Sequence, residues 1–210
     1  MTIPAVPSQP EFGAALPPRR SPETLALLAS RRSASAQFLA EPGPSPAELD
    51  DLLRLAARVP DHGKMTPWRF VVLRGEAKSA FVEEVRAIAA ARPDAARAQG
   101  ALAKLAPPPV CVAVLSVPRH GGKPVWEQQF SAAAACMSLL IAAAAMGYGA
   151  NWISDWYGED AGVLKLLGVD PGADPAPRLA GWIMLGTPSE APLERARADM
   201  GAVVSEWSPG

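Results

Sequence analysis

The chain has 210 residues, which suits one domain large enough to bury a sizeable core. Its 20 Lys and Arg residues are balanced by 21 Asp and Glu residues, so no basic field is present to attract nucleic acid or an anionic membrane. Two histidines and two cysteines, scattered along the chain, argue against a structural zinc site or another metal site. Cys111 and Cys136 lie in apolar runs, as free buried thiols in a reducing cytoplasm do.

The first 22 residues differ in composition from the rest of the chain. Within residues 1–20, five prolines fall among small and polar residues, at Pro4, Pro7, Pro10, Pro17 and Pro18. A signal peptide would need a charged start and an apolar stretch, which this segment lacks. We therefore expect residues 1–22 to be a flexible or draped arm, residues 23–210 to be one domain, and the protein to be cytoplasmic.

A helix is predicted from Ser21, where Ser-Pro-Glu is typical of an N-cap followed by proline at the first helical position. Its expected buried side consists of Leu25, Leu27 and Leu28. The helix runs into Arg31, Arg32 and Ser33, which places two guanidiniums and a hydroxyl at its end. Cations suit the negative end of the helix dipole and are often solvated there. The alternative is an anion clamp, because guanidinium forks and a hydroxyl can bind phosphate oxygens.

The stretch Arg58–Phe70 combines an imidazole, two guanidiniums, two prolines, a glycine and an indole within thirteen residues. A capping-box sequence at residues 45–48 opens the preceding helix, which should end at Arg58 because the proline two residues later disfavours helix before it. A turn around His62 then leads to a strand at about residues 70–74. The stretch is either a rigid, cationic ligand-binding loop or a plain connector with a locally satisfied histidine.

The remaining residues alternate between helical and strand patterns, an α/β organisation. The expected elements are two helices within residues 76–105 broken near 92–94, a central strand at 110–116, a loop at 118–124, the longest helix at 125–147, and short strands at 151–154 and 179–185.

The longest of these helices contains most of an uncharged stretch that runs from Phe130 to Ala150. This stretch is long enough to cross a bilayer. Much of its apolarity comes from alanine, and no second hydrophobic segment or flanking cationic cluster accompanies it. We expect a central helix that is buried on all sides and forms a homodimer surface, and no membrane span.

Several motifs, in a consistent order, resemble the nitroreductase family in its small YdjA-like branch. They are Arg31-Arg32-Ser33-Ala34-Ser35, Arg58 to His62, Pro67 to Phe70, Trp126-Glu127-Gln128, Gly147 to Ala150 with the adjoining Trp152-Ile153-Ser154, and Gly181 to Pro188. Together they cover about residues 24–190. The resemblance implies an α+β fold with a central, mostly antiparallel sheet flanked by helices. It also implies an intertwined homodimer with each FMN site shared between the subunits.

The resemblance assigns FMN contacts to three segments. The first segment, Arg31 to Ser33 with Arg32 between them, would face the phosphate and the pyrimidine edge of the ring. The second segment would supply two further contacts, from Arg58 and His62. The third segment would come from the other subunit and consists of Trp152, Ile153 and Ser154. At Ile153 the chain departs from the branch, which tends to carry a polar or cationic residue there. A backbone contact would survive that change, whereas a side-chain contact would not.

The resemblance assigns contact with the nicotinamide cofactor to a further stretch of the chain. It consists of Ala142, Ala143, Ala144, Ala145, Met146 and Gly147. Preference between NADH and NADPH stays open, because the loop residues Arg119, His120 and Lys123 could either meet a 2′-phosphate or be solvated.

The activity implied by the resemblance is that of an FMN-dependent NAD(P)H oxidoreductase. Hydride would pass from C4 of the nicotinamide to flavin N5, and then, in a ping-pong cycle, to a nitroaromatic, a quinone or a similar electrophile. No side chain need act as acid or base in the first half-reaction. Two alternatives remain: a flavin-binding or flavin-consuming protein without nicotinamide-dependent turnover, and a helical interaction module without a cofactor.

Overall fold

The computed structural model describes residues 3–209. Met1, Thr2 and Gly210, which belong to the expected arm and domain, lie outside the described residues. The helices are α1 (Pro22–Ser30), α2 (Pro46–Ala56), α3 (Gly75–Ala90), α4 (Ala95–Ala101), α5 (Val125–Ala145), α6 (Ala161–Leu166) and α7 (Met200–Val203). The strands are β1 (Leu39–Ala40), β2 (Trp68–Arg74), β3 (Val110–Ser116), β4 (Gly149–Ile153) and β5 (Arg178–Pro188). Short 3₁₀ turns occupy Ala36–Phe38, Leu102–Lys104 and Trp156–Gly158.

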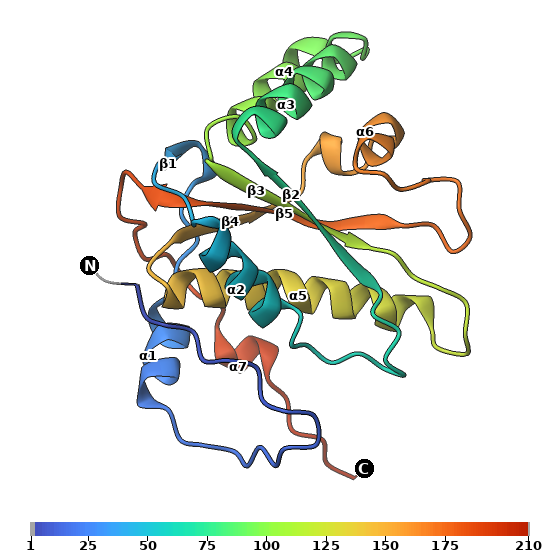
Figure 1. The fold of residues 1–210 in the computed structure, drawn as a ribbon. Coiled ribbons are helices and arrows are strands. Elements are labelled where there is room, and N and C mark those ends of the chain that lie inside the picture. Colours follow the sequence, from blue (N-terminus) through green and yellow to red (C-terminus); the bar gives the residue numbers. More distant parts are fainter. Residues whose placement is uncertain (1–2, 210) are drawn as a thin grey trace.

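The strands form one antiparallel sheet in the order β1-β5-β3-β2, and β4 also pairs with β5. The pairing of β3 with β5 shifts register after Val114, which lies opposite Gly181. Helices cover both faces: α2 and α5 lie on one side of the sheet, and α3, α4 and α6 lie on the other (Figure 1). The expected mostly antiparallel sheet flanked by helices is therefore confirmed.

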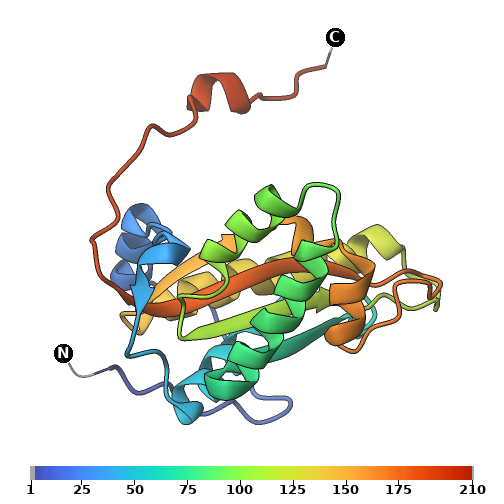
Figure 2. The ribbon, with the colours of Figure 1, turned by 90° about the horizontal axis from the view of Figure 1, so that it is seen from above.

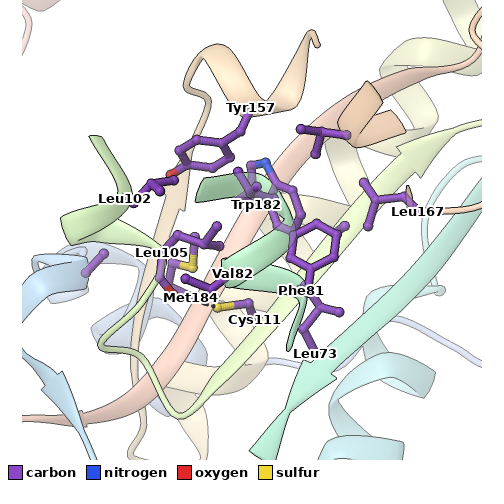
Figure 3. Close-up of a cluster of buried hydrophobic side chains, with 14 of the residues drawn as sticks. Leu73, Phe81, Val82, Leu102, Leu105, Cys111, Tyr157, Leu167, Trp182 and Met184 are labelled. Carbon is purple, nitrogen blue, oxygen red and sulfur yellow. Dashed lines mark hydrogen bonds between the residues drawn. The ribbon is translucent and has the colours of Figure 1, made fainter. Parts of the chain in front are cut away.

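The central strand β3 is buried along its whole length. Its alternate side chains enter two separate core clusters, with Cys111 in the first cluster and Val112 in the second. In the first cluster, Trp182 has two aromatic neighbours, Phe81 and Tyr157, each with a centroid-to-centroid distance of 5.8 Å (Figure 3). Burial on both faces explains why β3 is a continuous apolar run in the sequence.

The predicted boundaries agree with the structure to within a few residues. The helix α2 opens with the expected capping box, in which the Ser45 Oγ accepts from the Glu48 backbone N–H at 3.4 Å. It ends at Ala56, two residues before Arg58, and β2 begins two residues before the predicted strand. Helices α3 and α4 are separated at residues 91–94, where a break was expected.

Two predictions about buried helix faces are wrong for the single chain. The α1 leucines Leu25 and Leu28 are 69% and 48% exposed, and no residue of α1 is buried. On α5, Trp126 and Phe130 are 55% and 66% exposed, although the opposite side of the helix packs against the sheet. These apolar faces are open because no part of residues 3–209 covers them.

The helix α5 is long and apolar enough to meet the criterion for a membrane span. However, half of its most apolar window is buried inside the fold. Its inner side belongs to the second core cluster, with Cys136, Leu139 and Ala143 fully buried. This packing is that of a core helix.

The chain ends extend beyond the sheet and its helices. The N-terminal arm has no helix or strand between residues 3 and 20, but Ile3 and Val6 pack against the second core cluster and the Pro7 carbonyl accepts from Arg54 at 2.9 Å. After β5 the chain projects away from the body of the subunit (Figure 2). This C-terminal tail exposes Leu193 and Trp207, which are 84% and 87% accessible.

Candidate functional site

The first predicted cluster, Arg31 to Ser33, follows the end of α1. The Ser21 Oγ caps the helix start by accepting from the Thr24 backbone N–H at 3.2 Å, and the Arg31 backbone N–H donates to Leu27 at the helix end. The Arg31 Nη2 donates to the Ser33 Oγ at 3.3 Å. The cluster thus presents two guanidiniums and a hydroxyl together, a donor set suited to phosphate.

The neighbouring guanidinium contacts the C-terminal tail. The Arg32 Nε donates to the Leu193 carbonyl at 2.9 Å and lies 3.9 Å from the Glu194 Oε1. Arg197 also pairs with this carboxylate, at 2.8 Å. Arg32 therefore holds the tail beside the cluster while its other nitrogens remain available to a ligand.

Backbone hydrogen bonds join this cluster to β4. The Ala34 N–H donates to the Ala150 carbonyl at 3.0 Å, and the Asn151 side-chain amide donates back to the Ala34 carbonyl. A recess of about 420 Å³ opens beside this link, lined by residues 35–37, 151–154 and Lys104. The structure therefore brings the first and third predicted segments together within one subunit. Lys104, which sequence reasoning missed, lines the recess from a distant 3₁₀ turn that no motif marks, and its ammonium pairs with the Asp155 carboxylate at 3.1 Å.

The third segment has a fixed geometry. The Trp152 Nε1 donates to the Ala180 carbonyl at 3.1 Å, and a Cβ added at Gly181 would lie 2.0 Å from the same nitrogen. Glycine at this position therefore lets the indole lie across β5. Ile153 packs its side chain against the first core cluster, and it pairs with Trp182 of β5 in the sheet. A side-chain contact from Ile153 to a ligand would therefore require the side chain to leave the core.

The second predicted pair lies in the loop between α2 and β2. Asp61 accepts from the backbone N–H groups of Met65 and Thr66 at 2.9 and 2.8 Å, which closes the turn. Positive φ angles at Lys64 (54°) and Thr66 (47°) show a conformation that non-glycine residues seldom adopt. Such residues persist only where their surroundings hold them, as they often do at binding sites.

The same loop is also held from outside. The Arg119 guanidinium donates to the carbonyls of Met65 and Thr66, and the Ser131 Oγ on α5 donates to the Pro60 carbonyl at 2.6 Å. Arg58, by contrast, is exposed, and its guanidinium makes no hydrogen bond or ion pair within residues 3–209. The loop is therefore held by hydrogen bonds at several points, and Arg58 beside it is an unpaired cation among the residues that the structure describes.

His62 contacts the start of α5. Its Nδ1 lies 2.5 Å from the Glu127 Oε2, so the histidine is held by α5 while Asp61 bonds the backbone of its own loop. The sequence suggested at most a locally satisfied histidine and did not indicate Glu127 as its partner. The Trp126-Glu127-Gln128 motif contained the signal, but a separation of 65 residues gives no indication of contact.

The two halves of the predicted FMN site lie at opposite ends of α5. His62 and its loop contact Glu127 and Ser131 near the helix start, whereas Ala34 bonds to Ala150 just after the helix end (Figure 1). The fourteen residue-to-residue steps from Ser131 to Ala145, the last residue of α5, correspond to about 21 Å of helix. Within one subunit the loop of Arg58 and His62 is therefore remote from the cluster of Arg31 to Ser33.

The predicted nicotinamide stretch is only partly accessible. Ala142, Ala143 and Met146 belong to the second core cluster, with exposures of 7%, 0% and 5%. Ala144 is half-buried, and Ala145 and Gly147 are exposed at the helix end. Only the last three can therefore contact a nucleotide without opening the core.

The loop residues considered for a 2′-phosphate mostly have other partners. Arg119 bonds the backbone of the His62 loop, and the His120 Nε2 lies 3.2 Å from the Asp174 Oδ2. The aliphatic chain of Lys123 packs beside Gly63, where a Cβ would come within 2.7 Å of it. These contacts favour a structural role for Arg119 and leave the nucleotide preference open.

The buried titratable groups are not set up for nucleophilic catalysis. Burial raises the pKa values of the Cys111 and Cys136 thiols to about 12 each, so both remain protonated at neutral pH. Burial also lowers the pKa of Lys78, whose ammonium donates to the Ala106 carbonyl at the end of a 3₁₀ turn. Within residues 3–209, no group of three His, Cys, Asp or Glu side chains could hold a metal ion.

Comparison with known proteins identifies the family to which the chain belongs. Residues 28–187 match the Nitroreductase family. The chain is 37% identical over 168 residues to the Escherichia coli (strain K12) protein named "Putative NAD(P)H nitroreductase YdjA", covering 79% of this chain and 88% of that protein. The fold matches a nitroreductase-like protein from Bacillus cereus with a TM-score of 0.73, 18% identity and coverage of 91% and 98% of the two chains. It also matches a nitroreductase with bound FMN from Bacteroides fragilis, with a TM-score of 0.66, 19% identity and coverage of 90% and 100%. By its match over most of its length and its identity to a curated relative, the chain belongs to the nitroreductase family.

Proposed function

We propose that the protein is an FMN-dependent oxidoreductase that takes hydride from NADH or NADPH and passes it to a nitroaromatic, a quinone or a similar electrophile in a ping-pong cycle. The observation that carries this proposal is the cluster of Arg31, Arg32 and Ser33 beside the recess at β4. Membership of the family and the names of the E. coli and B. fragilis proteins support it.

The residues present fit FMN. Arg31, Arg32 and Ser33 would hold the phosphate, because guanidinium forks and a hydroxyl match its oxygens. The ring would lie beside residues 152–154, which line the recess at β4. Bound FMN supplies a ring that accepts and returns hydride. An arginine such as Arg58 near the pyrimidine edge would favour the reduced ring by its positive charge.

The separation of the two half-sites along α5 supports a homodimer with shared sites. One subunit would supply Arg31 to Ser33 and residues 152–154, and Arg58 and His62 would come from its partner. This division differs from the expectation that residues 152–154 come from the other subunit, because the link between Ala34 and Ala150 keeps the first and third segments in one chain.

Exposed apolar surfaces support the same assembly. The open side of α5 carries Trp126 and Phe130, and the C-terminal tail exposes Leu193 and Trp207. Large apolar patches are uncommon on soluble monomers and typically mark interfaces. A second subunit would cover the open side of α5 and give the projecting tail a surface to pack against.

Titration of the purified protein with FMN, followed by anaerobic addition of NADPH and then NADH, tests the proposal. We expect a yellow protein whose band at about 450 nm bleaches with one or both nucleotides and recovers when a nitroaromatic or quinone is added. A protein that binds FMN but does not bleach would instead be a flavin-binding or flavin-consuming protein. A protein that does not bind FMN would contradict the proposal entirely, and sedimentation of the FMN-loaded protein as a monomer would contradict the shared site.

A further inference from the structure

A carboxylate from the C-terminal tail lies at the edge of the arginine cluster beside α1. The Glu194 Oε1 lies 3.9 Å from the Arg32 Nε and 2.8 Å from the Arg197 Nη2. The Arg195 backbone N–H donates to the same oxygen at 2.8 Å. This hydrogen bond and the two guanidiniums lower the pKa of the Glu194 carboxyl, so it is charged at neutral pH. A negative charge therefore lies within the group of cations proposed to hold the FMN phosphate.

The tail keeps this carboxylate close to Arg32. The Arg32 Nε donates to the carbonyl of Leu193, the residue before Glu194, at 2.9 Å. Arg32 is half-buried and Glu194 is exposed, so the carboxylate can turn away from the guanidinium without uncovering the core. A group tethered this closely to its partner has an effective concentration of the order of millimolar or more. Glu194 is therefore a persistent anion at Arg32.

A second guanidinium gives the carboxylate another partner. The contact from Glu194 to Arg197 is shorter than the contact to Arg32, at 2.8 Å against 3.9 Å. When another anion takes Arg32, Glu194 can keep Arg197. Exposed ion pairs contribute little to stability, so this exchange costs little. The larger consequence is repulsion, because a phosphate monoester carries nearly two negative charges at neutral pH and Glu194 adds another beside it.

From these contacts we infer that Glu194 is a built-in competitor of the FMN phosphate. The carboxylate and the phosphate compete for Arg32, and phosphate binding turns Glu194 towards Arg197 alone. The charge of Glu194 then limits how tightly the protein retains its cofactor. The inference rests on the proposed function, since that function places the FMN phosphate at the cluster of Arg31 to Ser33.

Equilibrium titrations of the full-length protein with FMN and with riboflavin test the inference without turnover. Riboflavin has the same ring and lacks the phosphate. We expect Glu194→Gln and Glu194→Ala each to lower the FMN dissociation constant on the order of fivefold and to leave that of riboflavin unchanged. Glu206→Gln is the matched control, because it removes the same charge from an exposed position of the same tail. It should change neither dissociation constant.

Inorganic phosphate is the second probe. It should compete with FMN and not with riboflavin, and its inhibition constant against FMN should fall in Glu194→Gln on the order of fivefold. The series is measured at constant ionic strength in KCl, because salt screens interactions between exposed charges. An equal inhibition constant in the parent protein and in Glu194→Gln would contradict competition at Arg32.

Two results of the flavin titrations would overturn the inference. One is an FMN dissociation constant that is unchanged or higher in Glu194→Gln, and a higher value would show that Glu194 positions Arg32 for the phosphate. The other is equal tightening of FMN and riboflavin, which would show that the effect does not act on the phosphate. Bleaching by NAD(P)H is recorded on the same samples and decides the proposed function, whereas the affinities of the parent and variant proteins decide this inference.

Discussion

The division of the FMN site between subunits can be tested with two variants that are each defective alone. The structure places Arg31 and Arg58 near opposite ends of α5. If one site takes Arg31 from one subunit and Arg58 from its partner, a heterodimer of Arg31→Ala and Arg58→Ala chains contains one site with both arginines and one with neither. If both arginines of a site came from the same chain, each site of the heterodimer would lack one of them.

The expected size of the effect follows from the chemistry of each contact. A hydrogen bond to a charged group contributes about 2 kcal/mol, which corresponds to about a 30-fold change in a dissociation constant. Each homodimeric variant should therefore bind FMN about 30-fold more weakly at all of its sites. In the heterodimer, half of the sites should return to the affinity of the parent protein.

The assay requires heterodimers that are selected by two different affinity tags and titrated with FMN by fluorescence quenching. We expect a biphasic curve in which half of the sites have the parent affinity. A single weak phase would show that the two arginines act on the same flavin from the same chain, which would refute the inference drawn from their positions on α5. Equal affinities for both variants and the parent protein would remove both residues from the site.

Four further predictions concern the cofactor, the thiols, a glycine and the assembly. Arg58→Ala should lower the flavin reduction potential on the order of 30 mV, equivalent to about 1.4 kcal/mol for two electrons, and Arg58→Lys should repair this only in part, as dye-equilibration measurements would show. An unchanged potential with unchanged FMN affinity would place the loop away from the cofactor. Burial raises the pKa values of the Cys111 and Cys136 thiols from 9.0 to about 12. Their contribution to the free energy of unfolding is therefore fully present below pH 9 and should be lost as the pH rises towards 12, which urea unfolding at a series of pH values would show. Both thiols should also resist a thiol reagent at pH 8 until the protein is unfolded, and rapid reaction of the folded protein would contradict their burial. Gly181→Ala should lower the free energy of unfolding by about 1–3 kcal/mol and change the fluorescence of Trp152, because the new Cβ would lie 2.0 Å from the indole nitrogen. FMN should also lower the dissociation constant of the dimer in dilution series, and identical values with and without FMN would argue against a shared site.

Much of the fold could be predicted because its signals are local. The capping box at Ser45, the apolar run of β3 and the prolines that separate elements each depend on residues close in sequence. Their consequences, helix starts and strand limits, appear at nearly the predicted positions. The largest errors concern exposure of α1 and α5, because a sequence shows that a helix side is apolar but does not show which chain covers it.

The candidate site was predictable in composition and less so in arrangement. Arginine and serine in that pattern indicated an anion site, and the resemblance to the nitroreductase family implied that the anion belongs to a flavin. The contact between His62 and Glu127 joins residues 65 positions apart, and the link between Ala34 and Ala150 joins two loops across the fold. Long-range contacts of this kind are set by topology. The sequence therefore indicated three segments, and their division between one chain and another stays a prediction.

The position of α5 connects assembly with cofactor binding. The helix must be apolar on its inner side to pack against β3 and β5, and its length of 21 residues places its ends too far apart for one chain to complete the proposed site. A second copy that covers the open side brings the start of its own α5, with the His62 loop, towards the cluster at the end of the first. FMN bound across this junction would contact both chains, and any ligand that binds only the assembled state stabilises that state. The helix α5, which is uncharged from Phe130 onward and resembles a membrane span in the sequence, therefore has two linked roles in this proposal. It is the core of each subunit, and it is the spacer that makes the FMN site a property of the dimer.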